Sequence, residues 1–416
     1  MNSFFRKVLL LVGGAAGGQL IALALTPVLA RLYSPEDFQR VGLLISFGAP
    51  AIVVATLKYE AAIIGARTDD EARDLLSLSI VLSLLSAPLL SLIAAGIVVK
   101  NVLGYGALGT LGSVAVGMLS ASSGVFFALR AYLIRQEQYG QAAQISLLQG
   151  VAASAVRLAG GVLHLGFAGL AAGEVVNRTA GVLRGWRTAQ PRWLPWHEAL
   201  RVARAHRQFP RVILPSALID AVAVALPLPL LTVLTTVGTA GSFSLLQRTL
   251  FAVVAVVTAA MADVFQSRYA QLWRAEQGPQ AGQYLYRTLG ALGLQAGALG
   301  VLLYLCAPLA LRLFGEQWPQ LPAMIRWLIP WLCALYVVGP VSRVVFVHTE
   351  RASVKLIYDV SVVAFLVCFY ALVRSGTVHL ADPLLVVAIF SVINAVMYAV
   401  YLGVLLSLVH SQQRKV

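Results

Sequence analysis

Residues 75–99 read LLSLSIVLSLLSAPLLSLIAAGIVV, a run without a single charged side chain. A helix of about 20 predominantly apolar residues crosses the hydrocarbon core of a bilayer, and this run is long enough to do so. Lipid offers no hydrogen bonds, so a spanning segment has to satisfy its backbone N–H and C=O groups internally. The run therefore predicts a transmembrane helix.

Runs of the same kind recur along the whole chain. The 416 residues are 59% hydrophobic and 12% charged, whereas soluble globular proteins have about 25% charged residues. This composition excludes a soluble single-core protein and a disordered chain. Run length places spans at about residues 8–30, 41–64, 75–99, 107–129, 144–164, 166–184, 211–236, 242–265, 287–307, 325–347, 357–374 and 383–409. We predict an all-α polytopic membrane protein with about twelve transmembrane helices.

Helix start signals precede three of these runs. The Ser-Pro pair at residues 34–35 offers an N-cap hydroxyl and an N1 proline ahead of the second run. Thr68, with Glu71 three residues later, has the spacing of a capping box before the third run. The Asp-Pro pair at residues 382–383 opens the twelfth run in a similar way.

The distribution of Lys and Arg predicts the orientation. The chain has 31 Lys and Arg residues against 17 Asp and Glu residues, a net charge of +14. With both termini in the cytoplasm, most of these cations lie in inner loops, as the positive-inside rule requires. The outer loops then hold Arg31, Arg40, Lys100, Arg312, Arg326 and Arg374. We therefore predict a multi-pass protein with both termini cytoplasmic.

The longest polar segment, residues 185–210, divides the runs into two sets of six. It combines three Trp residues with a helical pattern that sets Arg201, Arg204 and Arg207 against small apolar side chains. Such a basic amphipathic helix is typical of a membrane interface, and the apolar surroundings disfavour the rival interpretation, nucleic-acid binding. The predicted domains are an N-terminal six-helix lobe (1–184), a basic amphipathic cytoplasmic linker (185–210) and a C-terminal six-helix lobe (211–416).

Charged residues within the runs are the sharpest sign of function. On insertion scales each costs about 2.5–3.5 kcal/mol at a helix centre, so it faces protein, water or a partner. Internal pairing and snorkelling to an interface are the alternatives to a functional role. The residues are Lys58, Glu60, Arg157, Glu174, Arg178, Asp220, Arg248, Asp263, Arg343 and Asp359.

Three of these arginines suit an anionic cargo, because a guanidinium presents a charged fork that matches phosphate oxygens. Arg157 lies near the middle of the fifth run, and Arg248 lies in the eighth. Arg178 follows Glu174 by four residues, so an ion pair within one helix competes with a binding role.

The acidic residues are candidates for ion coupling. Asp220, near the middle of the seventh run, is a candidate proton or cation site, and a hydrogen bond to a neighbouring helix explains it equally well. Glu174 and Asp359 are further candidates. Lys58 and Glu60 are two residues apart, so their side chains diverge by about 200° on a helix and we expect no ion pair between them.

No motif indicates an enzyme, a cofactor or a metal. The G-x-G-x-x-G match at residues 104–109 joins two spans and lacks a βαβ unit. No Walker motif is present, and the six His residues are scattered. Glycines spaced by four residues, at 14 and 18 and at 169 and 173, are expected to pack helices closely.

Segments near the N-terminus carry a family resemblance. Residues 27–38 read PVLARLYSPEDF, residues 58–64 read KYEAAII, and Asp-Glu-Ala follows at 70–72. Together with twelve runs and a basic central linker, they resemble the Wzx-type polysaccharide flippases. These belong to the multidrug/oligosaccharidyl-lipid/polysaccharide (MOP) exporter superfamily.

The resemblance implies two six-helix lobes around a central cavity and transport by alternating access. The implied cargo is an undecaprenyl-pyrophosphate-linked oligosaccharide, moved from the cytoplasmic to the outer leaflet of the bacterial inner membrane for O-antigen (lipopolysaccharide), capsule or exopolysaccharide assembly. Membrane lipids, a polysaccharide polymerase and chain-length proteins are the implied partners. The expected substrate contacts are Arg157, Arg178, Arg248, Lys58 and Glu60.

Two other classes remain to be distinguished. A proton- or cation-coupled small-molecule exporter of the same superfamily predicts a cavity rich in acids and aromatics rather than arginine. A membrane glycosyltransferase or polymerase needs a large outer loop or a catalytic domain, and the longest predicted outer loop spans only about residues 308–324.

Overall fold

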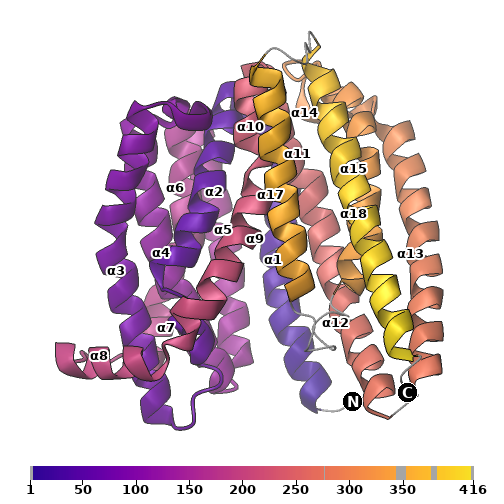
Figure 1. Ribbon diagram of the computed structural model, residues 1–416. Coiled ribbons are helices and arrows are strands. Elements are labelled where there is room, and N and C mark those ends of the chain that lie inside the picture. Colours follow the sequence, from indigo (N-terminus) through magenta and orange to yellow (C-terminus); the bar gives the residue numbers. More distant parts are fainter. Residues whose placement is uncertain (1–2, 276, 343–352, 376–381, 414–416) are drawn as a thin grey trace. The chain divides into compact units, whose positions relative to one another are not determined.

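The computed structural model describes residues 3–275, 277–342, 353–375 and 382–413. In this part of the chain every regular element is a helix (Figure 1). The helices form two compact units, Met1–Val233 (unit 1) and Leu234–Val416 (unit 2), so the predicted all-α, two-lobed fold is confirmed. The division between the units falls near the end of the seventh run, later than the linker at residues 185–210.

Ten helical stretches of the described chain are long and apolar enough to cross a membrane. Helix α1 (Ser3–Leu32) adds the shorter apolar stretch Gly17–Leu32, and α6 (Phe167–Thr179) has 13 residues. Within the described residues, each of the twelve predicted runs therefore falls on a helix or on consecutive helical segments.

Unit 1 contains the first seven runs and the polar segment between the sixth and seventh. Its further helices are α2 (Pro35–Ala55), α3 (Asp69–Val99), α4 (Gly109–Arg135), α5 (Tyr139–Val162), α7 (Val182–Ala189), α8 (Trp196–Ala205), α9 (Leu214–Ala225) and α10 (Pro227–Leu234). Short 3₁₀ segments, Tyr59–Ala62 and Val102–Leu108, precede α3 and α4, and a π-helical turn, Phe209–Ile213, leads into α9.

Unit 2 contains the last five runs. Its elements are α11 (Val237–Leu246), a π-helical segment (Gln247–Phe251), α12 (Ala252–Arg274), α13 (Gly278–Cys306), α14 (Leu309–Phe314), α15 (Leu321–Val341), α17 (Ser353–Arg374) and α18 (Pro383–Gln413). Helix α15 packs against α12, α13 and α18. The rings of Tyr358 and Tyr401 stack between α17 and α18, with centroids 4.3 Å apart.

The predicted helix starts are present. Ser34 caps α2 with Asp37, each side chain accepting a hydrogen bond from the other residue's backbone N–H. Thr68 accepts a hydrogen bond from the Glu71 N–H at the start of α3, as expected. Glu71 departs from the capping-box pattern, because its carboxylate accepts from the Arg67 N–H rather than from Thr68.

The predicted second and sixth spans are wrong in their second halves. Helix α2 ends at Ala55, and residues 56–68 turn back toward α3 instead of continuing the helix to residue 64. The predicted span 166–184 breaks at Ala180, so α6 is only about 20 Å long at 1.5 Å per residue. Both breaks bring polar side chains together in ways that a continuous helix would not.

Glycines set the close packing of α1, α5 and α6. A Cβ on Gly150 of α5 would lie 2.4 Å from the Gly18 Cα of α1, and a Cβ on Gly160 would lie 2.6 Å from the Gly169 Cα of α6. Only residues without side chains allow backbones to approach this closely. The expectation that Gly18 and Gly169 belong to packing faces is confirmed.

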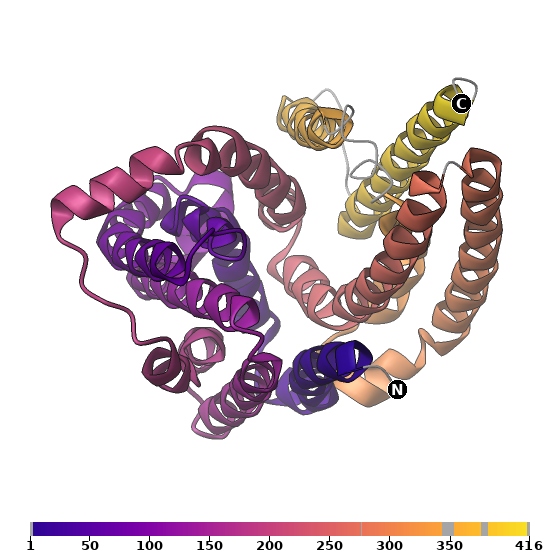
Figure 2. The ribbon, with the colours of Figure 1, turned by 90° about the horizontal axis from the view of Figure 1, so that it is seen from below.

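The linker at residues 185–210 runs along the periphery of unit 1 (Figure 2). Ala199 and Val202 of α8 are buried in a hydrophobic cluster with residues of α3 and α4. The apolar face of this helix therefore packs on protein, which the interface interpretation did not anticipate. Trp193 and Trp196 remain 84% and 69% exposed.

Candidate functional site: charged side chains within the helices of unit 1

Arg157 of α5 and Glu174 of α6 form a buried ion pair. Arg157 Nη2 lies 3.0 Å from Glu174 Oε1, and the two residues are 5% and 8% exposed. Gly173 provides the room, since a Cβ there would lie 2.3 Å from Arg157 Cγ. The Tyr33 hydroxyl donates a 2.6 Å hydrogen bond to the Arg157 backbone carbonyl and joins α1 to the same site.

This pair settles which partner Glu174 takes. The sequence suggested Arg178, four residues along α6, whereas the Glu174 carboxylate lies 3.0 Å from Arg157 on the neighbouring helix. A charge buried in a membrane helix is stabilised when it meets an opposite charge, so each residue here offsets the burial cost of the other.

Arg178 occupies the last turn of α6 and faces α4. Its guanidinium lies over the ring of Phe127, 5.4 Å from the centroid. Arg130 lies three residues after Phe127 on α4, close enough to Arg178 for the two positive charges to interact. Arg130 was not among the candidate residues, and its i,i+3 relation to the aromatic Phe127 was the available sequence signal.

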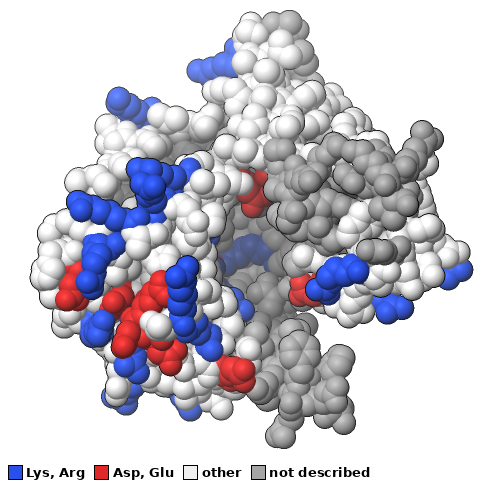
Figure 3. Space-filling model, turned by 60° about the horizontal axis from the view of Figure 1, so that its bottom comes forward, with Lys and Arg blue, Asp and Glu red and all other residues white. Residues whose placement is uncertain are grey.

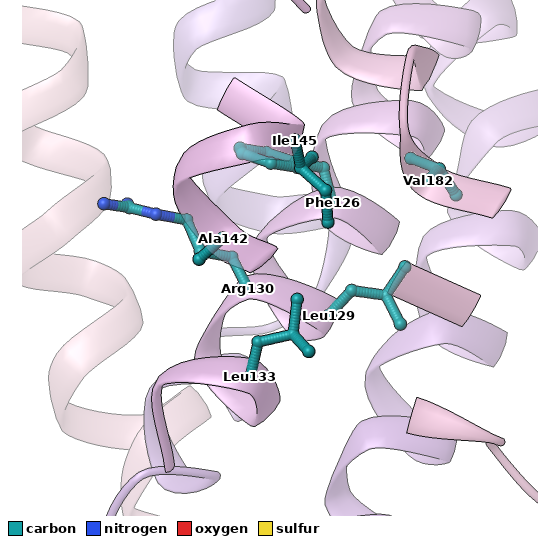
Figure 4. Close-up of a pocket in the computed structure, with 7 residues that line it drawn as sticks. All are labelled: Phe126, Leu129, Arg130, Leu133, Ala142, Ile145 and Val182. Carbon is teal, nitrogen blue, oxygen red and sulfur yellow. The ribbon is translucent and has the colours of Figure 1, made fainter. Parts of the chain in front are cut away.

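A small pocket adjoins Arg130. Apolar side chains of α4, α5 and α7 line it, among them Phe126, Leu129 and Ile145 (Figure 4). Its volume of about 10 Å³ holds no more than one water molecule. Figure 4 shows the Arg130 guanidinium extending away from these apolar side chains.

Lys58 and Glu60 do pair, contrary to the prediction. Lys58 has a φ of 65°, so the chain leaves the helical conformation there and its Nζ lies 3.1 Å from Glu60 Oε1. The expected divergence of about 200° assumed a helix, and α2 has already ended. The Thr56 hydroxyl donates a short hydrogen bond to the same carboxylate.

The turn that holds this pair also contacts the linker. The hydroxyl of Tyr59 donates a 3.1 Å hydrogen bond to the Ala203 carbonyl of α8. Burial raises the pKa of Tyr59, which keeps its hydroxyl protonated as a donor.

Two side-chain contacts attach the linker to the start of α3. Arg192 Nη2 lies 2.5 Å from Asp74 Oδ1, and His206 Nε2 lies 3.0 Å from Glu71 Oε1. The hydrogen bond to Asp74 raises the pKa of Arg192. Figure 3 shows Lys, Arg, Asp and Glu side chains intermingled on this end of unit 1.

The other candidate residues lie on other elements of the chain. Asp220 is exposed on α9, and Asp263 is exposed on α12. Arg248 lies in the π-helical segment that interrupts the eighth run. Asp359 is buried in α17 and lies 2.5 Å from the Nζ of Lys355, one turn earlier. Arg343 lies outside the described residues.

Solved structures share this fold over nearly the whole chain. An inward-facing multidrug-resistance MATE-family transporter of the MOP superfamily matches with a TM-score of 0.68 at 17% identity, covering 97% of this chain and 95% of that one. A MOP-superfamily transporter from Pyrococcus furiosus, described as having a binding pocket of reversed polarity that suggests a different function, matches with a TM-score of 0.59 at 16% identity, covering 97% and 96%.

The fold is thus that of a membrane transporter of the MOP superfamily. A family model described as "Polysaccharide biosynthesis protein" matches residues 28–322, and the chain belongs to this family. The predicted resemblance to Wzx-type flippases of the MOP superfamily is confirmed by the two findings together. No curated protein matches the chain significantly in sequence.

Proposed function

We propose that the protein is a flippase for undecaprenyl-pyrophosphate-linked oligosaccharide, working by alternating access in the bacterial inner membrane. The family match over residues 28–322 carries the proposal, because it joins a transporter fold to polysaccharide biosynthesis. The cytoplasmic leaflet is where the cargo is loaded, and the outer leaflet is where a polymerase and chain-length proteins take it over.

Arginines inside the helices support an anionic cargo. A diphosphate that leaves water needs replacement donors, and guanidinium groups supply charged, bidentate hydrogen bonds to phosphate oxygens. Arg248 lies on a π-helical turn, a rare geometry that is frequent at functional sites. We assign Arg248 to the diphosphate during transport.

The membrane potential supplies a driving force for this cargo. Moving negative charge outward across an inside-negative membrane gains about 2.3 kcal/mol per charge per 100 mV. The sequence has no Walker motif for a nucleotide, so the expected energy source is the potential, a coupled ion or the removal of product.

The test is transport by the purified chain in proteoliposomes that hold a fluorescent diphosphate-linked oligosaccharide lipid. Flipping should occur without ATP and should accelerate when an inside-negative potential is imposed. Arg248→Gln should slow it on the order of tenfold or more, as the loss of a charged hydrogen bond of about 1.5–3 kcal/mol implies. Arg204→Gln, on the exposed face of α8, is the control. Strict dependence on ATP, or normal flipping by Arg248→Gln, contradicts the proposal.

A proton- or cation-coupled exporter is the second candidate, and the buried carboxylates favour it. Glu174 and Asp359 are 8% and 3% exposed inside their helices, and intramembrane carboxylates commonly exchange protons. Efflux of a small organic cation driven by a pH gradient, lost in Asp359→Asn or Asp220→Asn at normal protein levels, would identify this function instead.

A further inference from the structure

Two arginines at the α7 end of unit 1, Arg130 and Arg178, are partly buried and pair with no carboxylate among the described residues. Arg130 lies five residues before the end of α4, and Arg178 lies in the last turn of α6, so both belong to the end of the bundle that leads to α7. Phe127 lies between them: it precedes Arg130 by three residues on α4, and its ring lies under the Arg178 guanidinium. Residues three apart share one face of a helix.

Three other arginines of unit 1 are paired with carboxylates. Arg157 pairs with Glu174, Arg135 Nη2 lies 3.2 Å from Asp69 Oδ1, and Arg192 bonds Asp74. These pairs show the usual way in which the bundle offsets the cost of a charge near lipid.

Among the described residues, Arg130 and Arg178 have no such partner. Neither forms an ion pair or a hydrogen bond with a described side chain, and the positive charge of Arg130 acts unfavourably on that of Arg178. Glu174 attracts Arg178 from one turn away but already bonds Arg157. Arg157 and Glu174 neutralise each other, so Arg130 and Arg178 contribute a net charge of +2 near the ends of α4 and α6.

Local structure offsets only part of this charge. The carboxyl end of α6 carries about half a negative charge from the helix dipole, and the Phe127 ring adds a cation–π contact worth about 0.5–2 kcal/mol. Two guanidinium groups held close together in a medium of low dielectric constant still repel each other strongly. An oxyanion between them would convert that repulsion into two charged hydrogen-bonding forks.

We propose that Arg130 and Arg178 bind the phosphate or diphosphate headgroup of a lipid at the α7 end of unit 1. This inference rests on the proposed function in one respect: if the cargo is a diphosphate lipid, the site holds its headgroup on the side where positive charges gather. An anionic membrane phospholipid is the other source of the same chemistry, and the experiment separates the two.

The experiment is native mass spectrometry of the full chain in detergent, titrated with farnesyl diphosphate, phosphatidylglycerol or phosphatidylcholine. Arg130→Gln/Arg178→Gln should bind farnesyl diphosphate at least tenfold more weakly than the wild type. Arg204→Gln, an exposed arginine of α8, should bind as the wild type does, and Arg178→Lys should retain part of the affinity because it keeps the charge.

The lipid arms identify the source. If the double variant loses farnesyl diphosphate binding and keeps phosphatidylglycerol binding, the site belongs to the cargo. If it loses binding of both lipids in parallel, the site binds anionic headgroups in general. Equal binding of farnesyl diphosphate by the double variant and the wild type overturns the site. If the double variant fails to fold, the melting temperatures of the wild type and Arg178→Lys are compared with and without inorganic pyrophosphate. Pyrophosphate should raise the melting temperature more in the wild type than in Arg178→Lys, and equal shifts overturn the site.

Binding and transport are measured separately, so the two proposals can fail independently. A chain that binds diphosphate lipid through these arginines without flipping it contradicts the proposed function alone. Flipping at the normal rate by a double variant that also binds normally contradicts the site alone.

Discussion

Arg157 Nη2 lies 3.0 Å from Glu174 Oε1 across the contact of α5 with α6, and glycines on both helices make that approach possible. The sequence presents these residues as separate intramembrane charges. Together they form one neutral unit, and this changes the outcome expected of substituting either residue.

Breaking the pair should destabilise the fold. Removing one partner of a buried ion pair leaves an uncompensated charge and typically costs about 3–5 kcal/mol. Arg157→Gln and Glu174→Gln should each lower the detergent melting temperature and the amount of membrane-inserted protein.

The double variant is the control for that prediction. Arg157→Gln/Glu174→Gln removes both charges and should recover most of the stability, because no isolated charge remains. Additive losses in the double variant would show that the pair has no coupling energy. A role for Arg157 in substrate contact alone would have Arg157→Ala abolish transport at normal protein levels, whereas the pair makes loss of folded protein the expected result.

The glycine contacts should tolerate no side chain. In Gly150→Ala the new Cβ would meet the Gly18 Cα at 2.4 Å, so α1 and α5 have to separate, at a cost of about 1–3 kcal/mol. Thermal unfolding of the purified protein measures this. Gly290→Ala in α13 meets nothing within 4 Å and should be neutral or slightly stabilising. Equal melting temperatures for the two variants would contradict the packing described here.

The linker should loosen when its contact with α3 is removed. Asp74→Ala deletes the carboxylate that bonds Arg192, a half-exposed contact, so trypsin cleavage after the arginines of α8 should accelerate a few-fold. Asp70→Ala, in the first turn of the same helix, is the matched control. An unchanged cleavage rate in Asp74→Ala would mean that the Tyr59 and His206 contacts hold the linker alone.

The orientation of the chain is tested with reporter fusions. Fusions at Gln190 and Gln412 should report the cytoplasm, because the positive-inside rule assigns the arginine-rich end to that side. A fusion at Asn101, in the turn between α3 and α4, should report the outside. A periplasmic signal at Gln190 would contradict the predicted topology and place the arginine-rich end outside.

Hydropathy alone was enough to predict the membrane-spanning helices. Each run had to be helical because lipid offers its backbone no hydrogen bonds, and that requirement acts within a single segment. Helix starts at Ser34 and Thr68 were equally local, since a cap joins residues three apart. The same local reasoning failed at Lys58 and at Ala180, where the chain leaves a helix without a proline or charge run to announce it.

The partners of the charged residues were decided by tertiary structure. Spacing along one helix proposed Arg178 for Glu174, but Gly173 and Gly169 bring α5 close enough for Arg157 to reach that carboxylate first. Arg130 became a candidate binding residue only because the packing of α6 against α4 brings Arg178 near it. The sequence determined which residues are charged and which segments enter the bilayer, because both follow from composition and run length. Which charges meet depends on the faces that packed helices turn toward each other, and only the tertiary structure specifies those faces.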